Sequence, residues 1–155
     1  MSRMHDLLQN LANSGKTLGS VESMTGGLFA AKATTVPGAS NVFKGAIVSY
    51  SREVKEKVLG IKGKLIDEEG VVSEVVAQQM AAKGREVLGV DVAISITGNA
   101  GPTAEPGKAE IGQVYLGLAT EDGTWSFGYK LEGSRDEIRE KAVELMITFG
   151  LSQAA

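Results

Sequence analysis

Val92-Ala93-Ile94-Ser95-Ile96 is an almost continuously apolar run, and it leads directly into the glycine-rich loop Thr97-Gly98-Asn99-Ala100-Gly101-Pro102. An apolar run of this length is typical of a central strand that is covered on both faces. Ligands of open α/β sheets gather beyond the carboxyl ends of such strands. The stretch therefore predicts a layered α/β domain, and residues 97–102 are either a ligand-binding loop or an ordinary tight loop.

Helical and strand patterns alternate along the rest of the chain. Near the end, every second residue from Trp125 to Leu131 is apolar, which predicts a strand that returns from the Asp122-Gly123 turn. This order predicts one domain over residues 1–155, a three-layer α/β/α unit with a mixed, mostly parallel sheet and a C-terminal antiparallel hairpin. The expected helices cover residues 4–12, 28–34, 52–59, 73–88 and 134–149, and the expected strands cover 17–22, 46–50, 92–96, 112–120 and 125–131, with an irregular connector at 60–70.

Two scarcities restrict the chemistry. The 155 residues include no cysteine and one histidine, His5, close to the start of the chain. Without cysteine there is no thiol nucleophile, no disulfide and no thiolate-bound metal. A single histidine near the start also makes a Ser-His-Asp triad or a multi-histidine metal site a poor expectation, so we expect no metal and no cofactor.

Charge and hydropathy indicate the kind of partner. The formal net charge is −3, and no basic block occurs along the chain. A nucleic-acid surface would need clustered lysine and arginine, so we expect no nucleic-acid partner. No stretch approaches 18 consecutive apolar residues, and the first residues lack the apolar core of a signal peptide. We therefore expect a cytoplasmic protein with no membrane partner.

A second glycine-rich turn, Ser23-Met24-Thr25-Gly26-Gly27, lies between an expected strand and an expected helix. Glycines at a helix N-terminus let a ligand approach free backbone N–H groups, and the helix dipole favours an anion there. The hydroxyls of Ser23 and Thr25 add polar groups to the same turn. The alternative is a plain turn in which Thr25 caps the helix.

Charged and aromatic side chains elsewhere supply further candidates. Tyr50 ends an expected strand, and Lys55 follows one helical turn later, where partial burial would lower its pKa and make it a usable base. Arg135 and Arg139 lie one turn apart in the last helix, a spacing that can clamp a phosphate or carboxylate. The alternatives are a rim tyrosine, a solvated lysine and a solvated helix face.

Seven motifs in one order are more specific than any of them alone. Together they resemble the CinA C-terminal domain family, the nicotinamide-nucleotide amidases or NMN deamidases, over nearly the whole chain. Two departures are Met24, where the family usually has cysteine, and Asn99, where an aliphatic residue is usual. The motifs are Glu22–Gly27, Val36–Ser40, Tyr50-Ser51 with Lys55, Gly70–Ser73, Thr97–Pro102, Gly112–Tyr115, and Gly133–Arg135 with Arg139.

The resemblance implies a three-layer α/β/α fold and a protein that is usually dimeric. It also implies that the protein hydrolyses the carboxamide of nicotinamide mononucleotide without a metal. It places the family's reactive serine at Ser23, its tyrosine at Tyr50 and its lysine at Lys55. The loop that includes Thr97, Gly98 and Gly101 falls in the substrate site. The family's late arginine is best matched by Arg139, with Arg135 second.

The chemistry that remains is consistent with this activity. An amide needs a nucleophile, a proton shuttle for the departing ammonia and stabilisation of the oxyanion. We expect Ser23 to attack or to align water, Lys55 to take the proton and Tyr50 to relay or orient. Backbone N–H groups near Thr25-Gly26-Gly27 would hold the oxyanion or the substrate phosphate.

Two other functions stay open. The chain is alternatively a catalytically weak CinA-like domain that binds a ligand or partner and is linked to competence or DNA damage. A third option is hydrolysis of a different small amide. The expected partners are thus a small-molecule nucleotide substrate and a second copy of the chain.

Overall fold

The computed structural model describes residues 2–104 and 109–153 and contains one five-stranded sheet in the order β2-β1-β3-β4-β5. β3 lies at the centre, parallel to β1 and antiparallel to β4, and β1 is also parallel to β2. β5 pairs antiparallel with β4 as the predicted hairpin. The strands are β1 Leu18–Glu22, β2 Phe43–Val48, β3 Val92–Gly98, β4 Gln113–Thr120 and β5 Gly123–Lys130.

The register of the three parallel strands brings their carboxyl ends together. Glu22 at the end of β1 lies opposite Val48 of β2 and Ile96 of β3. All five residues of β1 are buried, and so are the first six of β3, because helices cover both faces of this part of the sheet. The segments that follow β1, β2 and β3 therefore meet at one edge, where a parallel sheet binds ligands.

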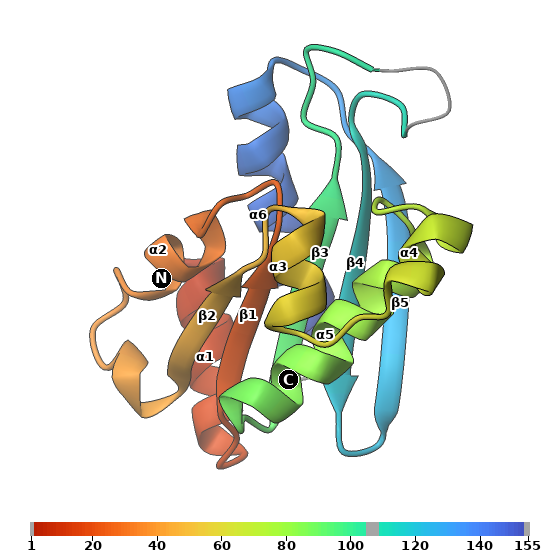
Figure 1. Cartoon of the computed structure of the whole chain (residues 1–155). Coiled ribbons are helices and arrows are strands. Elements are labelled where there is room, and N and C mark those ends of the chain that lie inside the picture. Colours follow the sequence, from red (N-terminus) through yellow and green to blue (C-terminus); the bar gives the residue numbers. More distant parts are fainter. Residues whose placement is uncertain (1, 105–108, 154–155) are drawn as a thin grey trace.

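Helices form the two outer layers (Figure 1). One apolar cluster joins α1, α2 and α6 to the sheet, and a second joins α4 and α5 to the other face. These layers confirm the predicted three-layer α/β/α fold. The helices are α1 Arg3–Asn13, α2 Leu28–Ala33, α3 Arg52–Lys57, α4 Gly63–Glu69, α5 Glu74–Leu88 and α6 Arg135–Gln153, with a short 3-10 turn at Ala39–Asn41.

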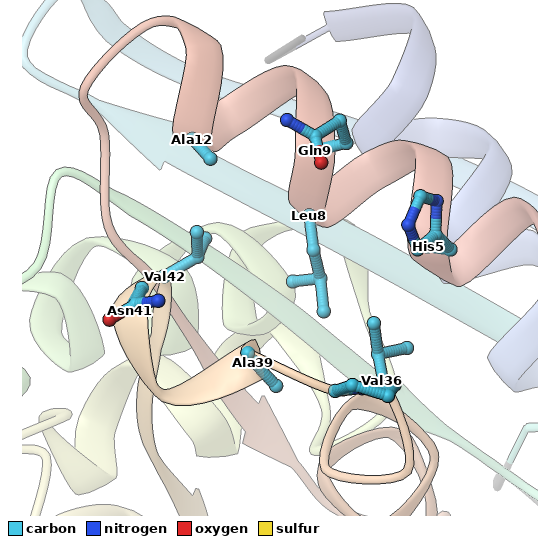
Figure 2. A pocket seen from close by; sticks show the side chains of 10 residues that line it. His5, Leu8, Gln9, Ala12, Val36, Ala39, Asn41 and Val42 are labelled. Carbon is cyan, nitrogen blue, oxygen red and sulfur yellow. The ribbon is translucent and has the colours of Figure 1, made fainter.

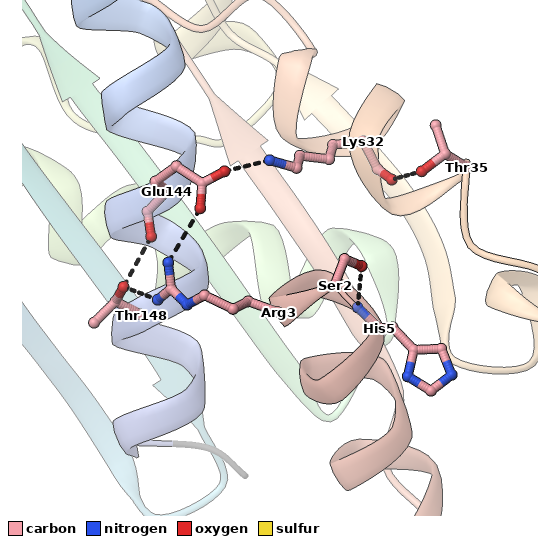
Figure 3. Close-up of polar contacts among 7 residues, drawn as sticks. All are labelled: Ser2, Arg3, His5, Lys32, Thr35, Glu144 and Thr148. Atoms are coloured by element: carbon pink, nitrogen blue, oxygen red, sulfur yellow. Dashed lines mark hydrogen bonds and ion pairs between the residues drawn. The ribbon is translucent and has the colours of Figure 1, made fainter.

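Glu144 links the three helices of the first layer (Figure 3). Its carboxylate pairs with Arg3 of α1 at 3.1 Å and with Lys32 of α2. Arg3 also donates to the hydroxyl of Thr148, one turn further along α6. A single exposed ion pair contributes little to the free energy of unfolding. Glu144, however, contacts side chains of both α1 and α2 and so connects these helices to α6.

Two expected elements differ from those observed. The strand expected at 46–50 is β2 at Phe43–Val48, because the Phe43 side chain is buried in the first cluster while Ser49 and Tyr50 leave the sheet. The connector expected at 60–70 contains α4, which buries Ile66 in the second cluster. Its helical pattern is short and is bounded by glycines, so periodicity alone does not reveal it.

The close contact between α5 and β4 gives a test of the packing. A Cβ added to Gly117 would lie 2.3 Å from the Ala77 carbonyl oxygen and 2.6 Å from the Ser95 Oγ. We expect Gly117→Ala to lower the free energy of unfolding by about 3 kcal/mol, because the main chain of α5 must move. Gly45→Ala is the matched control, since its Cβ would meet Leu88 at an ordinary 3.6 Å. Equal losses in the two variants, measured by urea denaturation, would contradict the packing.

Candidate active site

Ser23 and Lys55 form a buried pair at the carboxyl ends of β1 and β2. Ser23 directly follows β1, and its backbone N–H donates to the Ile96 carbonyl at 3.1 Å, which continues the pairing with β3. Lys55 lies in α3 and is fully buried. Its Nζ lies 3.0 Å from the Ser23 Oγ. The structure thus brings together two of the residues predicted to be catalytic.

Two backbone carbonyls fix the orientation of the Lys55 amine. Nζ donates to the carbonyl oxygens of Ser49 at 2.6 Å and Tyr50 at 3.3 Å. A neutral amine has two N–H donors and one lone pair. When both donors are taken by the carbonyls, the lone pair is directed at the hydroxyl of Ser23. The contacts of Lys55 with these two carbonyls were not predicted, because the sequence of side chains does not indicate which main-chain carbonyl will accept a hydrogen bond.

Burial lowers the pKa of Lys55 from 10.5 to about 8. The cause is desolvation, since taking an ammonium out of water disfavours its charged form. A base with this pKa is partly neutral near pH 7 and can accept a proton from a hydroxyl. The predicted depression of the Lys55 pKa is confirmed.

Local helix geometry places Lys55 where it is. The side chain of Ser51 caps α3 by accepting from the Val54 N–H at 3.1 Å, so the helix begins immediately after β2. Lys55 is one turn further on, on the inner side of the helix. Its backbone carbonyl accepts from the Ile61 N–H, which holds the end of α3 against the second apolar cluster.

A buried carboxylate, Glu22, holds the turn that follows β1. One of its oxygens accepts from the Thr25 hydroxyl at 2.8 Å and the Phe29 N–H at 2.9 Å. The other accepts from the Ser20 hydroxyl at 2.9 Å and the Ala30 N–H at 3.1 Å. No role of Glu22 was predicted from the sequence. The feature of the sequence that could have indicated this role is an acidic residue at the end of an expected strand, directly before a glycine-rich turn.

Glu22 changes the expected role of the Ser23–Gly27 turn. The chain's own carboxylate takes the free N–H groups at the start of α2, and the hydroxyl of Thr25 is used in the same way. The Gly26 N–H donates to the Ser23 carbonyl. Within the described part of the chain, no acceptor meets the N–H groups of Thr25 and Gly27.

The two arginines of α6 have different surroundings. Arg139 donates to the carbonyls of Met24 and Thr25, each at 3.0 Å, and thereby holds the turn after β1. Arg135 is exposed, donates to the Gly101 carbonyl and lies 3.5 Å from the Tyr50 hydroxyl. Arg135 therefore joins the loops after β2 and β3, and its guanidinium lies beside the Tyr50 hydroxyl.

The main chain and the side chain of Tyr50 make separate contacts, one with Lys55 and one with Arg135. Its carbonyl accepts from Lys55, whereas its ring is 63% exposed and its hydroxyl meets Arg135. The ring hydroxyl is therefore on the outer side of the Ser23–Lys55 pair.

Close contacts and hydrogen bonds shape the end of β3 and the loop that follows it. Thr97 is buried and donates to the Val71 carbonyl at 3.2 Å. A Cβ on Gly98 would lie 2.6 Å from a Val114 methyl and 2.9 Å from the Gln113 carbonyl, so glycine is required there. Asn99 accepts from the Gly101 N–H and donates to the Ala109 carbonyl, each at 2.9 Å. A cavity of about 490 Å³ opens beside Gly98 and Asn99.

The Val36–Ser40 motif lies elsewhere. It forms a loop beside α1, and the two enclose a cavity of about 270 Å³ whose lining includes His5, Leu8 and Val36 (Figure 2). The motif therefore does not contribute to the Ser23–Lys55 pair.

The described residues contain no cluster of three or more His, Asp or Glu side chains that could hold a metal ion. In the same part of the chain, the helices are too short or too polar to cross a membrane.

Comparison with known proteins identifies the family. The model of the CinA C-terminal domain matches residues 2–152. The chain belongs to the CinA C-terminal domain family. A CinA-like protein of Desulfotalea psychrophila is 40% identical over 136 residues, which are 88% of this chain and 33% of that protein. The chain spans about a third of the length of the curated relatives it matches.

Solved structures of CinA proteins share the fold. The competence-damaged protein (CinA) superfamily protein of Escherichia coli has a TM-score of 0.94 at 24% identity, over 99% of this chain and 88% of that one. The competence or damage-inducible protein of Enterobacter asburiae has a TM-score of 0.92 at 26% identity, over 98% and 96%. The resemblance stated from sequence motifs is thereby confirmed at the level of the family.

The buried Lys55 predicts a specific dependence of stability on pH. Its pKa is about 8 in the folded chain and near 10.5 when unfolded, so the unfolded chain binds more protons between these values. We expect the free energy of unfolding of the wild type, relative to Lys55→Met, to rise by about 3 kcal/mol between pH 7 and pH 11. Other titrating groups cancel in the difference. A difference that stays constant with pH, measured by urea denaturation, would show that the folded pKa is not depressed.

The four hydrogen bonds to Glu22 predict that an amide cannot replace the carboxylate. Each oxygen accepts from one backbone N–H, so the side chain introduced by Glu22→Gln must turn its NH₂ group toward one of these donors. We expect a loss of about 3 kcal/mol in the free energy of unfolding. Exposed Glu69 supplies the control, Glu69→Gln, for which the expected change is under about 0.5 kcal/mol. Similar stabilities for the two variants would rule out this role.

Proposed function

We propose that the chain is an amidohydrolase that converts nicotinamide mononucleotide and water to nicotinic acid mononucleotide and ammonia. The observation that carries the proposal is the buried Lys55 amine 3.0 Å from the Ser23 Oγ, with its other contacts made to main-chain carbonyls. A lysine with a depressed pKa beside a serine is a recurrent way to activate a hydroxyl nucleophile without histidine.

In the first step, the neutral Lys55 accepts the proton of the Ser23 hydroxyl as Oγ attacks the carboxamide carbon. The new C–O bond gives a tetrahedral intermediate with an oxyanion. The Lys55 ammonium then gives its proton to the departing nitrogen, the C–N bond breaks, and ammonia leaves an ester on Ser23.

In the second step, water attacks the ester carbon and gives a proton to Lys55. The ester C–O bond breaks, Lys55 returns the proton to Ser23, and the product leaves as the pyridine carboxylic acid, which gives its remaining proton to the solvent. The N–H groups of Thr25 and Gly27 are the donors we assign to the oxyanion in both steps, because they belong to the turn that follows Ser23 and the N–H groups at the start of α2 already donate to Glu22.

We assign the nucleotide phosphate to Arg135. This side chain is exposed and lies beside the Tyr50 hydroxyl and the Gly101 loop. A guanidinium suits phosphate because of its planar array of donors. Arg139 is given a positioning role, since it holds the carbonyls of Met24 and Thr25.

A second candidate function rests on the names of similar proteins of known structure, which refer to competence and damage. In that case the domain binds a ligand or partner and turns over slowly. Because the Ser23–Lys55 pair does not by itself specify one amide, hydrolysis of another small carboxamide is the third candidate.

Ammonia release from nicotinamide mononucleotide tests the proposal. We expect Ser23→Ala and Lys55→Met each to lower kcat at least about 1,000-fold, because each removes a group needed to form the first C–O bond. The matched controls are Ser40→Ala and Lys57→Ala, which change an exposed serine and an exposed lysine of the same helix as Lys55. Both controls should retain activity within about twofold.

Free nicotinamide separates the candidates. Activity on the mononucleotide but not on free nicotinamide supports recognition of the phosphate. In Arg135→Ala we then expect kcat/KM for the mononucleotide to fall, mainly because KM rises. Near-native release by Ser23→Ala or Lys55→Met would refute the mechanism. Tight binding of the mononucleotide without turnover would favour the second candidate.

A further inference from the structure

Asn99 ties together the two arms of the loop between β3 and β4. Its main chain is paired with the start of β4, because its N–H donates to the Gln113 carbonyl at 3.1 Å and its carbonyl accepts from the Gly112 N–H at 2.7 Å. Its side-chain NH₂ group donates to the carbonyl of Thr103 at 3.3 Å and to that of Ala109 at 2.9 Å. The side chain of Asn99 therefore extends from a fixed main chain and contacts both arms of the loop.

The amide oxygen of Asn99 fixes the main chain at Gly101. It accepts from the Gly101 N–H at 2.9 Å, which closes an Asx-turn. Gly101 has a φ of 73°, and a Cβ at this position would lie 2.8 Å from an Ile111 methyl group. Ala100, between Asn99 and Gly101, is buried in the first apolar cluster. These contacts set the course of the chain at Gly101, and with it the direction of the Gly101 carbonyl.

The Gly101 carbonyl in turn holds the guanidinium of Arg135. One terminal nitrogen of Arg135 donates to this carbonyl, and the other lies 3.5 Å from the Tyr50 hydroxyl. Figure 1 shows the start of α6, where Arg135 lies, beside the loop after β3. A guanidinium has five N–H donors, and the described residues engage only two of those on Arg135, so the others are available to an anion.

An arginine that is held in one orientation binds phosphate better than a mobile one. A phosphate that binds a mobile arginine must first restrict the rotamers of this long side chain, and that cost reduces the affinity. The contact with the Gly101 carbonyl restricts Arg135 before the phosphate arrives. Asn99 supports this arrangement without a charge of its own, so it does not repel a phosphate as a carboxylate would.

We propose that Asn99 is a positioning residue for phosphate recognition: its amide oxygen holds Gly101, and the Gly101 carbonyl holds Arg135 in the orientation that binds the phosphate of a mononucleotide. This inference rests on the proposed function and deepens it, because it names the contact through which the site distinguishes a nucleotide from its nucleoside. Asn99 acts on binding, and the Ser23–Lys55 pair carries out the reaction.

Ammonia release from nicotinamide mononucleotide and from nicotinamide riboside, the same compound without its phosphate, tests the proposal. Asn99→Ala removes the amide oxygen, so we expect the ratio of kcat/KM for the mononucleotide to that for the riboside to fall about fivefold to tenfold, mainly because KM for the mononucleotide rises. Asn99→Ser keeps an oxygen that can accept from the Gly101 N–H, so it should restore most of the ratio. Asn10→Ala, which changes an exposed asparagine of α1, should leave the ratio unchanged.

A double variant shows whether Asn99 acts through Arg135. Arg135→Ala should lower the same ratio more than Asn99→Ala does, because it removes the phosphate-binding group itself. When Arg135 is already alanine, the further change Asn99→Ala should alter the ratio less than about twofold. Two effects that add in full would show that Asn99 acts by another route, and would overturn the proposal.

Inorganic phosphate gives a readout that does not depend on turnover. We expect the ¹⁵N–¹H signal of the Arg135 Nε, assigned with Arg135→Ala, to shift as phosphate is added, with chloride at equal ionic strength as the background. Asn99→Ala should raise the dissociation constant for phosphate about fivefold or more. If the wild type releases no ammonia but responds to phosphate in this way, the amidase proposal fails and the positioning role of Asn99 stands.

Four results would overturn the positioning role. These are an Arg135 signal that does not respond to phosphate, equal phosphate affinities of the wild type and Asn99→Ala, an equal loss of kcat on both substrates in Asn99→Ala, and an Asn99→Ser variant no better than Asn99→Ala. Far-UV circular dichroism establishes that the variants are folded. If Asn99→Ala is unfolded, Asn99→Leu takes its place, because it removes the amide oxygen and keeps the volume of the side chain.

Discussion

The candidate site depends on the hydrogen bonds that the carboxylate of Glu22 accepts from the turn after β1 and from the start of α2. This carboxylate is buried at the end of β1 and accepts four hydrogen bonds, two from backbone N–H groups at the start of α2. A buried charge is tolerated only when it is well solvated by such donors. Because these bonds fix the course of the chain from Ser20 to Ala30, they also fix the direction in which Ser23 leaves the strand. Arg139 holds the same turn from the opposite side through two carbonyls.

The burial of Lys55 favours its proposed role as a base but lowers the stability of the folded chain at neutral pH. Its burial disfavours the ammonium, which lowers the free energy of unfolding at neutral pH but yields an amine able to accept a proton. The carbonyls of Ser49 and Tyr50 make this arrangement tolerable, because they satisfy two N–H groups in either protonation state. β2 ends before these residues, so the strand boundary itself supplies the acceptors. A longer β2 would have engaged them in the sheet.

The sequence predicts much of the fold and the centre of the site. The apolar run of β3, the Asp122-Gly123 turn and the residues Ser23 and Lys55 lie as their patterns indicate, because burial and spacing act locally. α4 was not predicted, since two apolar side chains between glycines leave no clear period. The positioning contacts of Arg139 are made to carbonyls 114 and 115 residues away in the chain, and such contacts have no local signature. The contacts of Glu22 span only two to eight residues, but a single buried carboxylate at a strand end forms no periodic pattern that assigns its donors. The exposure of Trp125 was also not predictable, because alternation shows which residues share a face but not whether anything covers it.

The packing of α1 against α6 has a consequence for how the domain is made. α1 buries Met4, Leu7, Leu8 and Leu11 in the same cluster as α6, and Arg3 pairs with Glu144. During synthesis the apolar side of α1 leaves the ribosome before α6, the helix that covers it. The first layer of the domain therefore closes only after translation has reached the end of α6. Until then, the apolar face of α1 stays without its main cover.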